Sequence, residues 1–257
     1  MEGICVFNLV PVRANDSDKS EMVTQLLFGD QYTVVEQSEN GKWLKIEITD
    51  DQYLGWIDYK LHTELSVKHL NQNLPNHFNA DSVSILENGE IQKVIFFGSY
   101  LPTFDGDYVY INELRYRFIG KANKMEKIVQ PEVIIERAKM YLETPYLWGG
   151  KSHAGIDCSG LVQMVYRSCG YQLMRDAWQQ ASMGYAVDNL EKANSGDLAF
   201  FSNDSGRVTH VGILLDNHSI IHAHGKVRID KIDERGIING DSGLYSHKLD
   251  GIRTVLG

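Results

Sequence analysis

Cysteine is scarce in this sequence: only Cys5, Cys158 and Cys169 occur among 257 residues. Three thiols cannot all pair with one another, and their spacing matches neither a disulfide framework nor a zinc clip. The simpler interpretation is that the thiols are reduced and that the protein resides in the cytoplasm. The segment Met1–Cys5 agrees with this, because it lacks the basic stretch and apolar run of a secretory signal, although trimming of a longer chain would look the same.

Long apolar runs and an excess of positive charge are also missing. The longest apolar stretches, such as Val94–Phe97 and Val211–Leu215, are the size of strands, whereas a membrane helix needs about 20 apolar residues. We therefore expect no membrane span. Lys and Arg number 25 against 34 Asp and Glu, which gives a formal net charge of −9. Such a charge opposes binding to phosphate backbones, so no nucleic-acid partner is expected.

The composition that remains is that of a folded globular protein. Hydrophobic residues make up 43% of the chain and charged residues 23%, which are ordinary values for globular domains. The length allows two or three compact units, each with its own core. The sequence pattern then decides where one unit ends and the next begins.

Residues 1–65 have the pattern of a small barrel of short strands. Turn residues, for example Gly29-Asp30 and Asn40-Gly41, separate the apolar stretches. The expected strands are Ile4–Val12, Met22–Phe28, Tyr32–Gln37, Trp43–Ile48 and Tyr53–Ile57. The segment resembles a bacterial SH3-like domain, on the basis of Pro11–Ala14, Glu21–Gly29, Gly41–Ile46 and Leu54–Ile57.

Residues 66–127 have the same texture without a clear repeat of the sequence. Turns are expected at Asn88-Gly89 and Phe104–Gly106. The strands expected around them are Ser82–Leu86, Ile91–Phe97, Tyr108–Ile111 and Tyr116–Ile119. We interpret this segment as a second, divergent SH3-like barrel.

From Pro131 onward the apolar residues first follow the period of a helix. Helices are expected over Glu132–Glu143, Cys158–Cys169 and Asp176–Met183. Gly170 supplies the C-terminal stop of the second helix. Strands then follow at Asp197–Phe201, Val208–Leu215, Ser219–His224 and Val227–Asp230. Helices followed by an antiparallel sheet predict an α+β domain over residues 128–257.

Cys158 is a candidate nucleophile because it stands at a helix start, directly after Gly155-Ile156-Asp157. Unpaired backbone N–H groups and the positive end of the helix dipole stabilise a thiolate, so we expect a lowered pKa for this thiol. The alternative is that Cys158 is only a small apolar residue at the helix start, as Cys169 is expected to be further along. Position alone does not decide between the two.

Two histidines on neighbouring expected strands, His210 and His222, offer a base for this thiol. If the connecting turn is odd in length and centred on Asn217, the two share a sheet face and lie diagonally across the strand pair. An even turn without a bulge places them on opposite faces. In the first case His210 takes the Cys158 proton and later protonates a leaving amine, while His222 orients it. His224 is the rival of His222 for that orienting role.

Six segments of the C-terminal half follow, in order, the signature of the NlpC/P60 peptidases: Tyr146–Gly150, Gly155–Val162, Arg175–Gln180, Gly196–Leu198, His210–Ile213 and His222-Ala223. Together they are far more specific than one short motif. The resemblance implies an α+β fold in which a papain-like domain follows one or two SH3-like barrels, with no metal or cofactor. The arrangement further resembles γ-D-glutamyl-L-diamino-acid endopeptidases, also called dipeptidyl-peptidases VI, which recycle muropeptides.

The resemblance also implies catalytic roles. Cys158 would be the nucleophile, His210 the base and His222 the third member. Tyr146 would help the backbone N–H of Cys158 to hold the developing oxyanion. The alternative for Tyr146 is a core aromatic residue beside Trp148.

Five further residues are implied to bind substrate. Asp157 and Ser159 would contact the D-glutamyl portion, although Asp157 could equally be only a helix cap. Asp176 would bind the free α-amine of an N-terminal L-Ala. Glu21 and Tyr53, from the first barrel, would add acidic and phenolic groups for the same amine; a surface Glu and a barrel Tyr are the alternatives. Such a pocket would reject intact cell wall, because a blocked amine leaves buried charge unpaired.

The expected activity is therefore hydrolysis of the γ-D-glutamyl bond in small muropeptides such as L-Ala-γ-D-Glu-diamino acid, with release of L-Ala-D-Glu. One alternative is an amidase or endopeptidase acting on intact peptidoglycan, since a fold does not fix the bond attacked. Another is a peptidoglycan-binding module with an inactive papain-like domain. The sequence leaves open whether the diamino acid is diaminopimelate or lysine.

Overall fold

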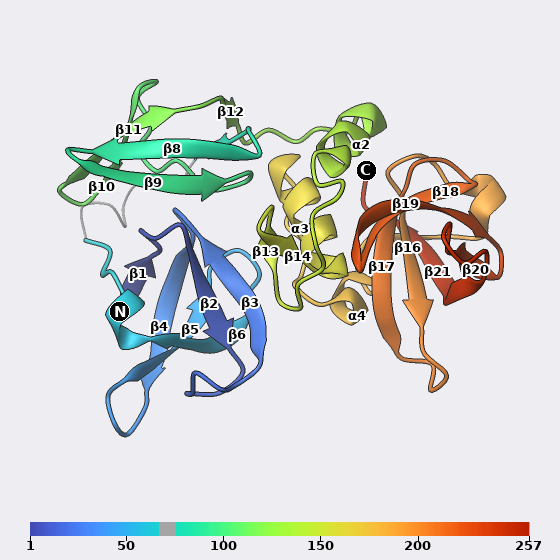
Figure 1. Ribbon diagram of the computed structural model, residues 1–257, viewed down its shortest axis with the longest axis horizontal. Coiled ribbons are helices and arrows are strands. Elements are labelled where there is room, and N and C mark those ends of the chain that lie inside the picture. Colours follow the sequence, from blue (N-terminus) through green and yellow to red (C-terminus); the bar gives the residue numbers. More distant parts are fainter. Residues whose placement is uncertain (67–75, 257) are drawn as a thin grey trace. The chain divides into compact units, whose positions relative to one another are not determined.

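Most of the regular secondary structure is β-strand, and the strands are distributed over two units (Figure 1). The computed structural model describes residues 1–66 and 76–256. Unit 1 consists of Met1–Glu126 and Trp148–His153, and unit 2 consists of Lys127–Leu147 and the chain from Ala154 onward. The sequence-based domain bounds 1–65, 66–127 and 128–257 stay predictions, and their portion at 67–75 lies outside the described residues.

The first part of unit 1 is a six-stranded antiparallel sheet with the order β1-β4-β5-β6-β2-β3. Its strands are β1 (Glu2–Ile4), β2 (Leu9–Arg13), β3 (Met22–Leu27), β4 (Gln31–Gln37), β5 (Trp43–Ile48) and β6 (Leu54–Asp58), and the 3₁₀ turn η1 (Tyr59–Leu61) follows. The expectation of one continuous strand over Ile4–Val12 is wrong. The chain leaves the sheet after Ile4 because Cys5 exchanges backbone hydrogen bonds with the turn at Gly29 and Asp30, both of 2.8 Å.

The second part of unit 1 is a four-stranded sheet with the order β10-β11-β8-β9, beside a two-stranded pair. The four strands are β8 (Val83–Asn88), β9 (Ile91–Phe96), β10 (Tyr108–Ile111) and β11 (Leu114–Ile119); the pair is β7 (His77–Asn79) with β12 (Ala122–Lys124). All four strands expected from the sequence are present within two residues of their expected bounds. The sequence did not indicate β7 or β12, because strands of three residues have almost no periodicity to detect.

One hydrophobic core joins the two sheets of unit 1. Phe28, at the end of β3, is fully buried in a cluster with Leu86 and Ile95 of the second sheet. Its ring meets that of Tyr116 edge to face, with the ring centroids 5.8 Å apart. Its backbone oxygen accepts a hydrogen bond of 3.0 Å from Tyr100. The two sheets therefore depend on each other for burial of their apolar faces.

Substitution of Phe28 by Ala is expected to destabilise both sheets of unit 1 together, by about 3–5 kcal/mol, because it empties a shared core site. Hydrogen exchange followed by mass spectrometry on the intact chain would show protection falling in β8 and β9 as well as in β3. Val35→Ala, at a position 49% exposed on β4, is the control. Loss of protection confined to β1–β6 would contradict the shared core.

Unit 2 begins with three helices, α2 (Pro131–Lys139), α3 (Cys158–Ser168) and α4 (Ala177–Gln180). The expected helix Glu132–Glu143 ends four residues early, because the chain turns there and Glu143 adopts a left-handed φ of 69°. The expected stop of α3 is confirmed, since Gly170 has a φ of 78°. The third helix is half its expected length. Among the described residues, no helix combines the length and apolar character needed to cross a membrane.

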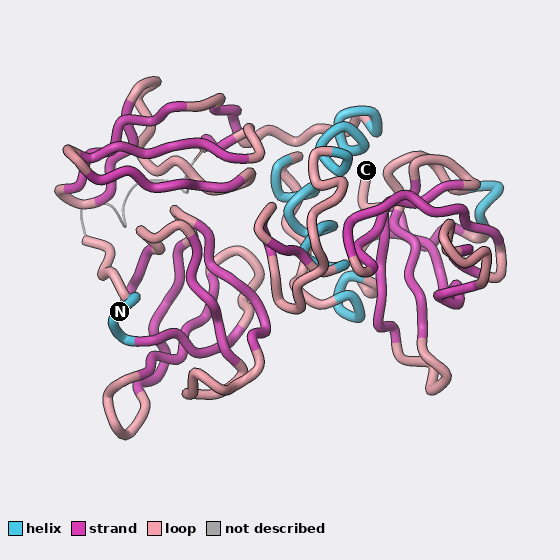
Figure 2. Tube along the Cα trace, viewed as in Figure 1, coloured by secondary structure: helices cyan, strands magenta, loops and turns pink. Residues whose placement is uncertain are grey.

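The sheet of unit 2 closes on itself. Its order is β15-β21-β16-β17-β18-β19-β20, and an additional pairing of β20 with β21 joins six of its strands into a ring. The bounds of these strands are β15 (Tyr185–Val187), β16 (Leu198–Ser202), β17 (Val208–Leu214), β18 (Ser219–His224), β19 (Lys226–Asp233), β20 (Gly236–Ile238) and β21 (Tyr245–Thr254). The remaining elements, which lie outside this sheet, are β13 (Lys151–Ser152), β14 (Gly155–Ile156) and the 3₁₀ turn η2 (Leu190–Lys192). The four strands expected from the sequence are β16–β19. Helices α3 and α4 pack against β17 of this ring (Figure 2).

Candidate active site

The N-terminus of α3 places Cys158 beside strand β17. Asp157 is the N-cap of this helix, and its Oδ1 accepts a hydrogen bond of 2.7 Å from the Gly160 N–H. Cys158 is the first helical residue and is 6% exposed. The N–H of Val211 lies within hydrogen-bonding reach of its sulfur. The thiol is therefore next to the backbone of the residue that follows His210.

Arg175 holds the residues on both sides of Cys158. Its guanidinium donates two hydrogen bonds to the Asp157 carboxylate, of 3.1 and 2.6 Å, and a third of 2.8 Å to the Ser159 hydroxyl. The Arg175 side chain is 1% exposed. A bidentate pair of this kind fixes direction as well as distance. Asp157 thus acts as a helix cap and as an anchor for Arg175, and its predicted contact with substrate, like that of Ser159, stays a prediction.

The expectation that the helix start lowers the pKa of Cys158 is wrong in this structure. Burial raises the pKa of the thiol to about 12, and the neighbouring Asp157 charge acts in the same direction. The N–H groups of Val211 and Ser159 and the charge of Arg175 lower the pKa, but by less. Burial outweighs these contacts because a thiolate loses its hydration when it is enclosed.

The register of β17 and β18 is the one that the predicted pairing of His210 with His222 requires. Gly212 pairs with His222, Ile213 with Ile221 and Leu214 with Ile220, so the turn is centred on Asn217. This confirms the odd turn, with His210 and His222 on one face. His210 Nε2 and His222 Nδ1 lie 2.9 Å apart, within hydrogen-bonding distance.

Gly212 leaves room for this pair of histidines. A Cβ built at position 212 would lie 2.9 Å from the Cβ of His222, closer than two side chains can pack. His222, which lies diagonally across the strand pair from His210, is the histidine that hydrogen-bonds to the proposed base. The His224 ring lies parallel to that of His222, with centroids 6.1 Å apart.

Burial also sets the charge of His210. Its pKa lies well below the ordinary value of histidine, because the ring is enclosed and because His247, His222 and His224 surround it. At neutral pH both His210 and the Cys158 thiol are therefore uncharged. A neutral imidazole has a lone pair that can accept a proton, as the predicted role of His210 as base requires.

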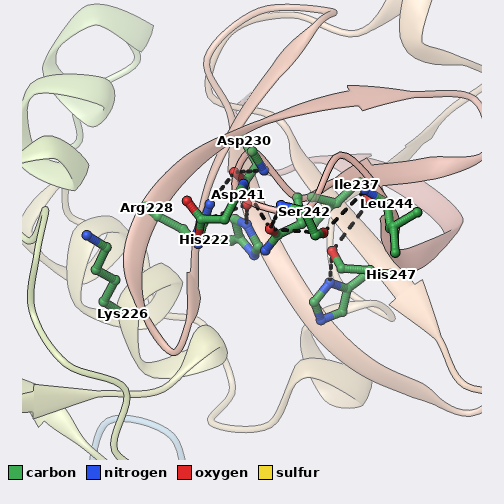
Figure 3. A network of polar contacts seen from close by, with 12 residues as sticks. His222, Lys226, Arg228, Asp230, Ile237, Asp241, Ser242, Leu244 and His247 are labelled. Atoms are coloured by element: carbon green, nitrogen blue, oxygen red, sulfur yellow. Dashed lines mark hydrogen bonds and ion pairs between the residues drawn. The ribbon is translucent and has the colours of Figure 1, made fainter.

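Sequence analysis missed Asp230, which lies on β19 behind His222 (Figure 3). His222 Nε2 is 3.0 Å from Asp230 Oδ2, and both side chains are fully buried. Asp230 Oδ1 accepts hydrogen bonds of 3.0 Å from Arg228 and from the Gly240 N–H. Arg228 in turn donates to Asp241, at 2.6 Å. Charged residues at alternate positions of a strand, Arg228 and Asp230, were the signal that could have revealed this network.

His247 is a second residue that sequence analysis missed, because β21 was not expected. Its ring stacks on that of His210, with centroids 4.1 Å apart and an angle of 22° between the rings. Burial, followed by the nearby His222 and His224, lowers the pKa of His247 to about 4. His247, His224, His210 and Tyr146 line a cavity of about 230 Å³.

Three of these histidines could hold a metal ion. Within the described part of the chain, His210, His222 and His247 place one ligand nitrogen each within 4.8 Å of the others. His222 already uses Nδ1 toward His210 and Nε2 toward Asp230. A cation bound there would have to break one of these hydrogen bonds. The geometry as it stands favours proton transfer along the chain of side chains.

Tyr146 also faces this site. It is half-buried, and burial together with the neighbouring Cys158 and Asp157 raises the pKa of its phenol, which therefore stays protonated. Its backbone N–H donates to Gly225, at 2.9 Å. Tyr146 is thus close to the thiol, as its expected role in holding an oxyanion requires.

The three residues expected to bind an amine have different surroundings. Asp176 is the N-cap of α4, and its Oδ2 accepts a hydrogen bond of 3.2 Å from the Trp178 indole. Glu21 is exposed and accepts one of 2.6 Å from the Trp148 indole within unit 1. Tyr53 packs, partly buried, against the core of the first sheet. The amine-binding role of all three stays a prediction.

Comparison with known proteins identifies the chain. The NlpC/P60 family matches residues 143–240, and a bacterial dipeptidyl-peptidase SH3 domain matches residues 12–60. A γ-D-glutamyl-L-lysine dipeptidyl-peptidase of Bacillus subtilis is 30% identical over 222 residues, which are 78% of this chain and 71% of that protein. The chain belongs to the NlpC/P60 family of cysteine peptidases.

Other relatives of this NlpC/P60 peptidase extend over nearly its whole length. Dipeptidyl-peptidase 6 of Lysinibacillus sphaericus is 26% identical over 91% of this chain and 93% of its own. The crystal structure of an NlpC/P60 family protein from Bacillus cereus has a TM-score of 0.82 at 21% identity and covers 100% of both chains. The latter likeness shows the fold alone. The expected α+β class, with one or two SH3-like barrels before a papain-like domain, is confirmed.

Because the Cys158 thiol of the NlpC/P60 peptidase is neutral at pH 7, we expect its alkylation to become faster as the pH rises. The rate constant with iodoacetamide should rise about tenfold per pH unit between about pH 6 and 9, because only the thiolate reacts. Mass spectrometry of the Cys158 peptide measures it, and Cys158→Ala gives the background from Cys5 and Cys169. A rate that is level below pH 7 would show instead a thiolate paired with a protonated His210.

Proposed function

We propose that this NlpC/P60 peptidase hydrolyses the bond between γ-D-glutamate and the diamino acid of small muropeptides with a free N-terminal L-Ala, releasing L-Ala-D-Glu. The observation that carries the proposal is the hydrogen-bonded pair of His210 and His222 beside the enclosed thiol of Cys158. The match of residues 12–60 to a bacterial dipeptidyl-peptidase SH3 domain supports this type of substrate. So do the dipeptidyl-peptidase names of relatives in two bacteria.

The reaction is nucleophilic catalysis through a thioester. As the sulfur of Cys158 attacks the γ-carbonyl carbon, its proton passes to His210. The tetrahedral intermediate collapses when the carbon–nitrogen bond breaks, and the amine of the diamino acid leaves with the proton from His210. A water molecule then gives a proton to His210 and attacks the thioester. The thiol regains that proton, and L-Ala-D-Glu leaves with a free γ-carboxyl group.

Two donors are proposed for the oxyanion of these intermediates. The N–H of Cys158 is one, because the first N–H groups of a helix have no partner within it. The hydroxyl of Tyr146 is the other, and its raised pKa keeps it protonated at neutral pH. Both groups belong to unit 2. The proposed chemistry of bond cleavage therefore needs only this unit.

The free amine is the feature proposed to select small substrates. An ammonium group that loses its water must gain carboxylate partners, and an acylated amine would leave those carboxylates without a counter-charge. We assign this recognition to Asp176, with contributions from Glu21 and Tyr53. We assign the D-glutamyl portion to Asp157 and Ser159.

Cleavage of L-Ala-γ-D-Glu-diamino acid peptides tests the proposal. Wild type should release L-Ala-D-Glu from the free-amine peptide but no N-acetyl-L-Ala-D-Glu from its N-acetylated form. Cys158→Ala should release neither product, as measured by mass spectrometry. Peptides with lysine and with diaminopimelate at the third position show which is preferred. Cleavage of both forms would restore intact peptidoglycan as a substrate. No cleavage of either would favour a binding module.

Substitution of the amine-binding candidates should weaken selection without stopping chemistry. Asp176→Asn and Glu21→Gln are each expected to lower kcat/KM for the free-amine peptide by about tenfold or more, because each removes one charge-assisted hydrogen bond. Glu39→Gln, an exposed change of the same charge in unit 1, is the control. An effect of Glu21→Gln no larger than that of the control would remove Glu21 from the proposed amine site.

A further inference from the structure

A buried carboxylate lies at the inner end of the histidine pair. Strand β19 pairs with β18 so that His222 is opposite Arg228, and Asp230 follows two residues later on the same face. The Asp230 carboxylate and the His222 imidazole are both completely shielded from water, with 3.0 Å between Oδ2 and Nε2. An enclosed carboxylate is costly unless every oxygen has partners. Here the ring of His222 is one of the partners.

The other partners of Asp230 are all donors. The Nε atom of Arg228 lies 2.8 Å from Oδ2 of Asp230. Nη2 of Arg228 and the N–H of Gly240 both donate to Oδ1 of Asp230. Burial alone would raise the pKa of Asp230, but hydrogen bonds from His222, Gly240 and Arg228 hold it well below its usual range. Asp230 is therefore an anion. A carboxylate anion can only accept hydrogen bonds.

This restriction sets the proton positions along the whole chain of side chains. Because Asp230 only accepts, Nε2 of His222 must be the protonated nitrogen. Burial lowers the pKa of His222 despite the neighbouring carboxylate, so the ring is neutral and its Nδ1 is an acceptor. His210 must then donate from Nε2, across the 2.9 Å between the rings. Nδ1 of His210 is left with a free lone pair, which is what a base for Cys158 needs.

We propose that Asp230 is a positioning residue of the peptidase, whose carboxylate fixes the tautomer of His222 and, through it, the tautomer of His210. The proposal rests on the catalytic roles of Cys158 and His210 stated under the proposed function. Asp230 is not a catalytic residue, because two imidazole rings separate it from the thiol. Arg228, itself bonded to Asp241, keeps the carboxylate in place (Figure 3).

Asp230→Asn is the variant that tests this role, because it keeps the shape and removes one acceptor. Arg228 and Gly240 both donate toward this side chain, so the single amide oxygen should turn to them and the NH₂ group should face His222. His222 would then accept at Nε2 and donate from Nδ1. His210 would be forced to carry its proton on Nδ1, where it can no longer take one from the thiol.

Two measurements on Asp230→Asn separate positioning from structure. Its kcat should fall by about 10²–10⁴-fold at neutral pH, the range for a mis-set catalytic histidine, while KM stays within about twofold. Nitrogen-15 NMR of the histidine rings should show Nε2–H tautomers for His222 and His210 in wild type and Nδ1–H tautomers in the variant. Asp233→Asn, which removes another hydrogen-bonded carboxylate of β19, should change neither.

The outcomes distinguish this proposal from the proposed function. If His222 and His210 keep Nε2–H in Asp230→Asn, or carry Nδ1–H in wild type, the role of Asp230 is overturned whatever happens to kcat. If the variant does not fold, the wild-type spectrum alone decides. If wild type does not cleave the muropeptide, the proposed function fails. The tautomers, measured without substrate, still test Asp230.

Discussion

The register between β17 and β18 is the constraint on which the active site depends. With Gly212 opposite His222, the two histidines lie on one face and their rings meet at 2.9 Å. A shift of one residue would move one ring of the pair to the opposite face. The odd turn centred on Asn217 excludes that shift, and Gly212 provides space beside His222. A local feature of one hairpin therefore decides whether a base can be oriented at all.

Enclosure of the site shapes its chemistry. Burial raises the pKa of the Cys158 thiol and lowers that of His210, so both are neutral before substrate arrives. The structure therefore does not maintain an ion pair in a dry environment, where charges are costly. The charge has to develop as the sulfur attacks. In the proposed reaction, Tyr146 and the N-terminus of α3 are already in place beside the thiol and need no rearrangement.

Permanent charges stand close by and are compensated by dedicated partners. Arg175 is paired with Asp157 at one side of Cys158, and Arg228 is paired with Asp230 and Asp241 behind the histidines. In both networks a guanidinium holds a carboxylate that has a further structural contact. Asp157 also caps the helix of Cys158, and Asp230 also hydrogen-bonds to His222. Bidentate geometry makes arginine suited to both tasks.

Closure of the sheet adds what the neighbouring strands alone cannot supply. Strand β21 pairs with both β16 and β20 and brings His247 onto the ring of His210. Nothing in the sequence near His247 distinguishes it, because its partner lies 37 positions earlier in the chain. Strand β21 also has little apolar alternation by which it could be recognised. The cavity beside His210 therefore belongs to the closed sheet as a whole.

The sequence by itself determined the local features: the α+β order, the helix start at Cys158 and the stop at Gly170. These depend on residues close together in the chain, where glycine and apolar period act directly. The sequence left the register of the histidine hairpin open between an odd and an even turn, and the strand pairing decided it. Tertiary structure alone decided that the pKa of the Cys158 thiol is raised and that Asp230 is the carboxylate partner of His222. Burial and the contact with Asp230 arise from packing of distant strands, and no local pattern encodes how much water that packing removes.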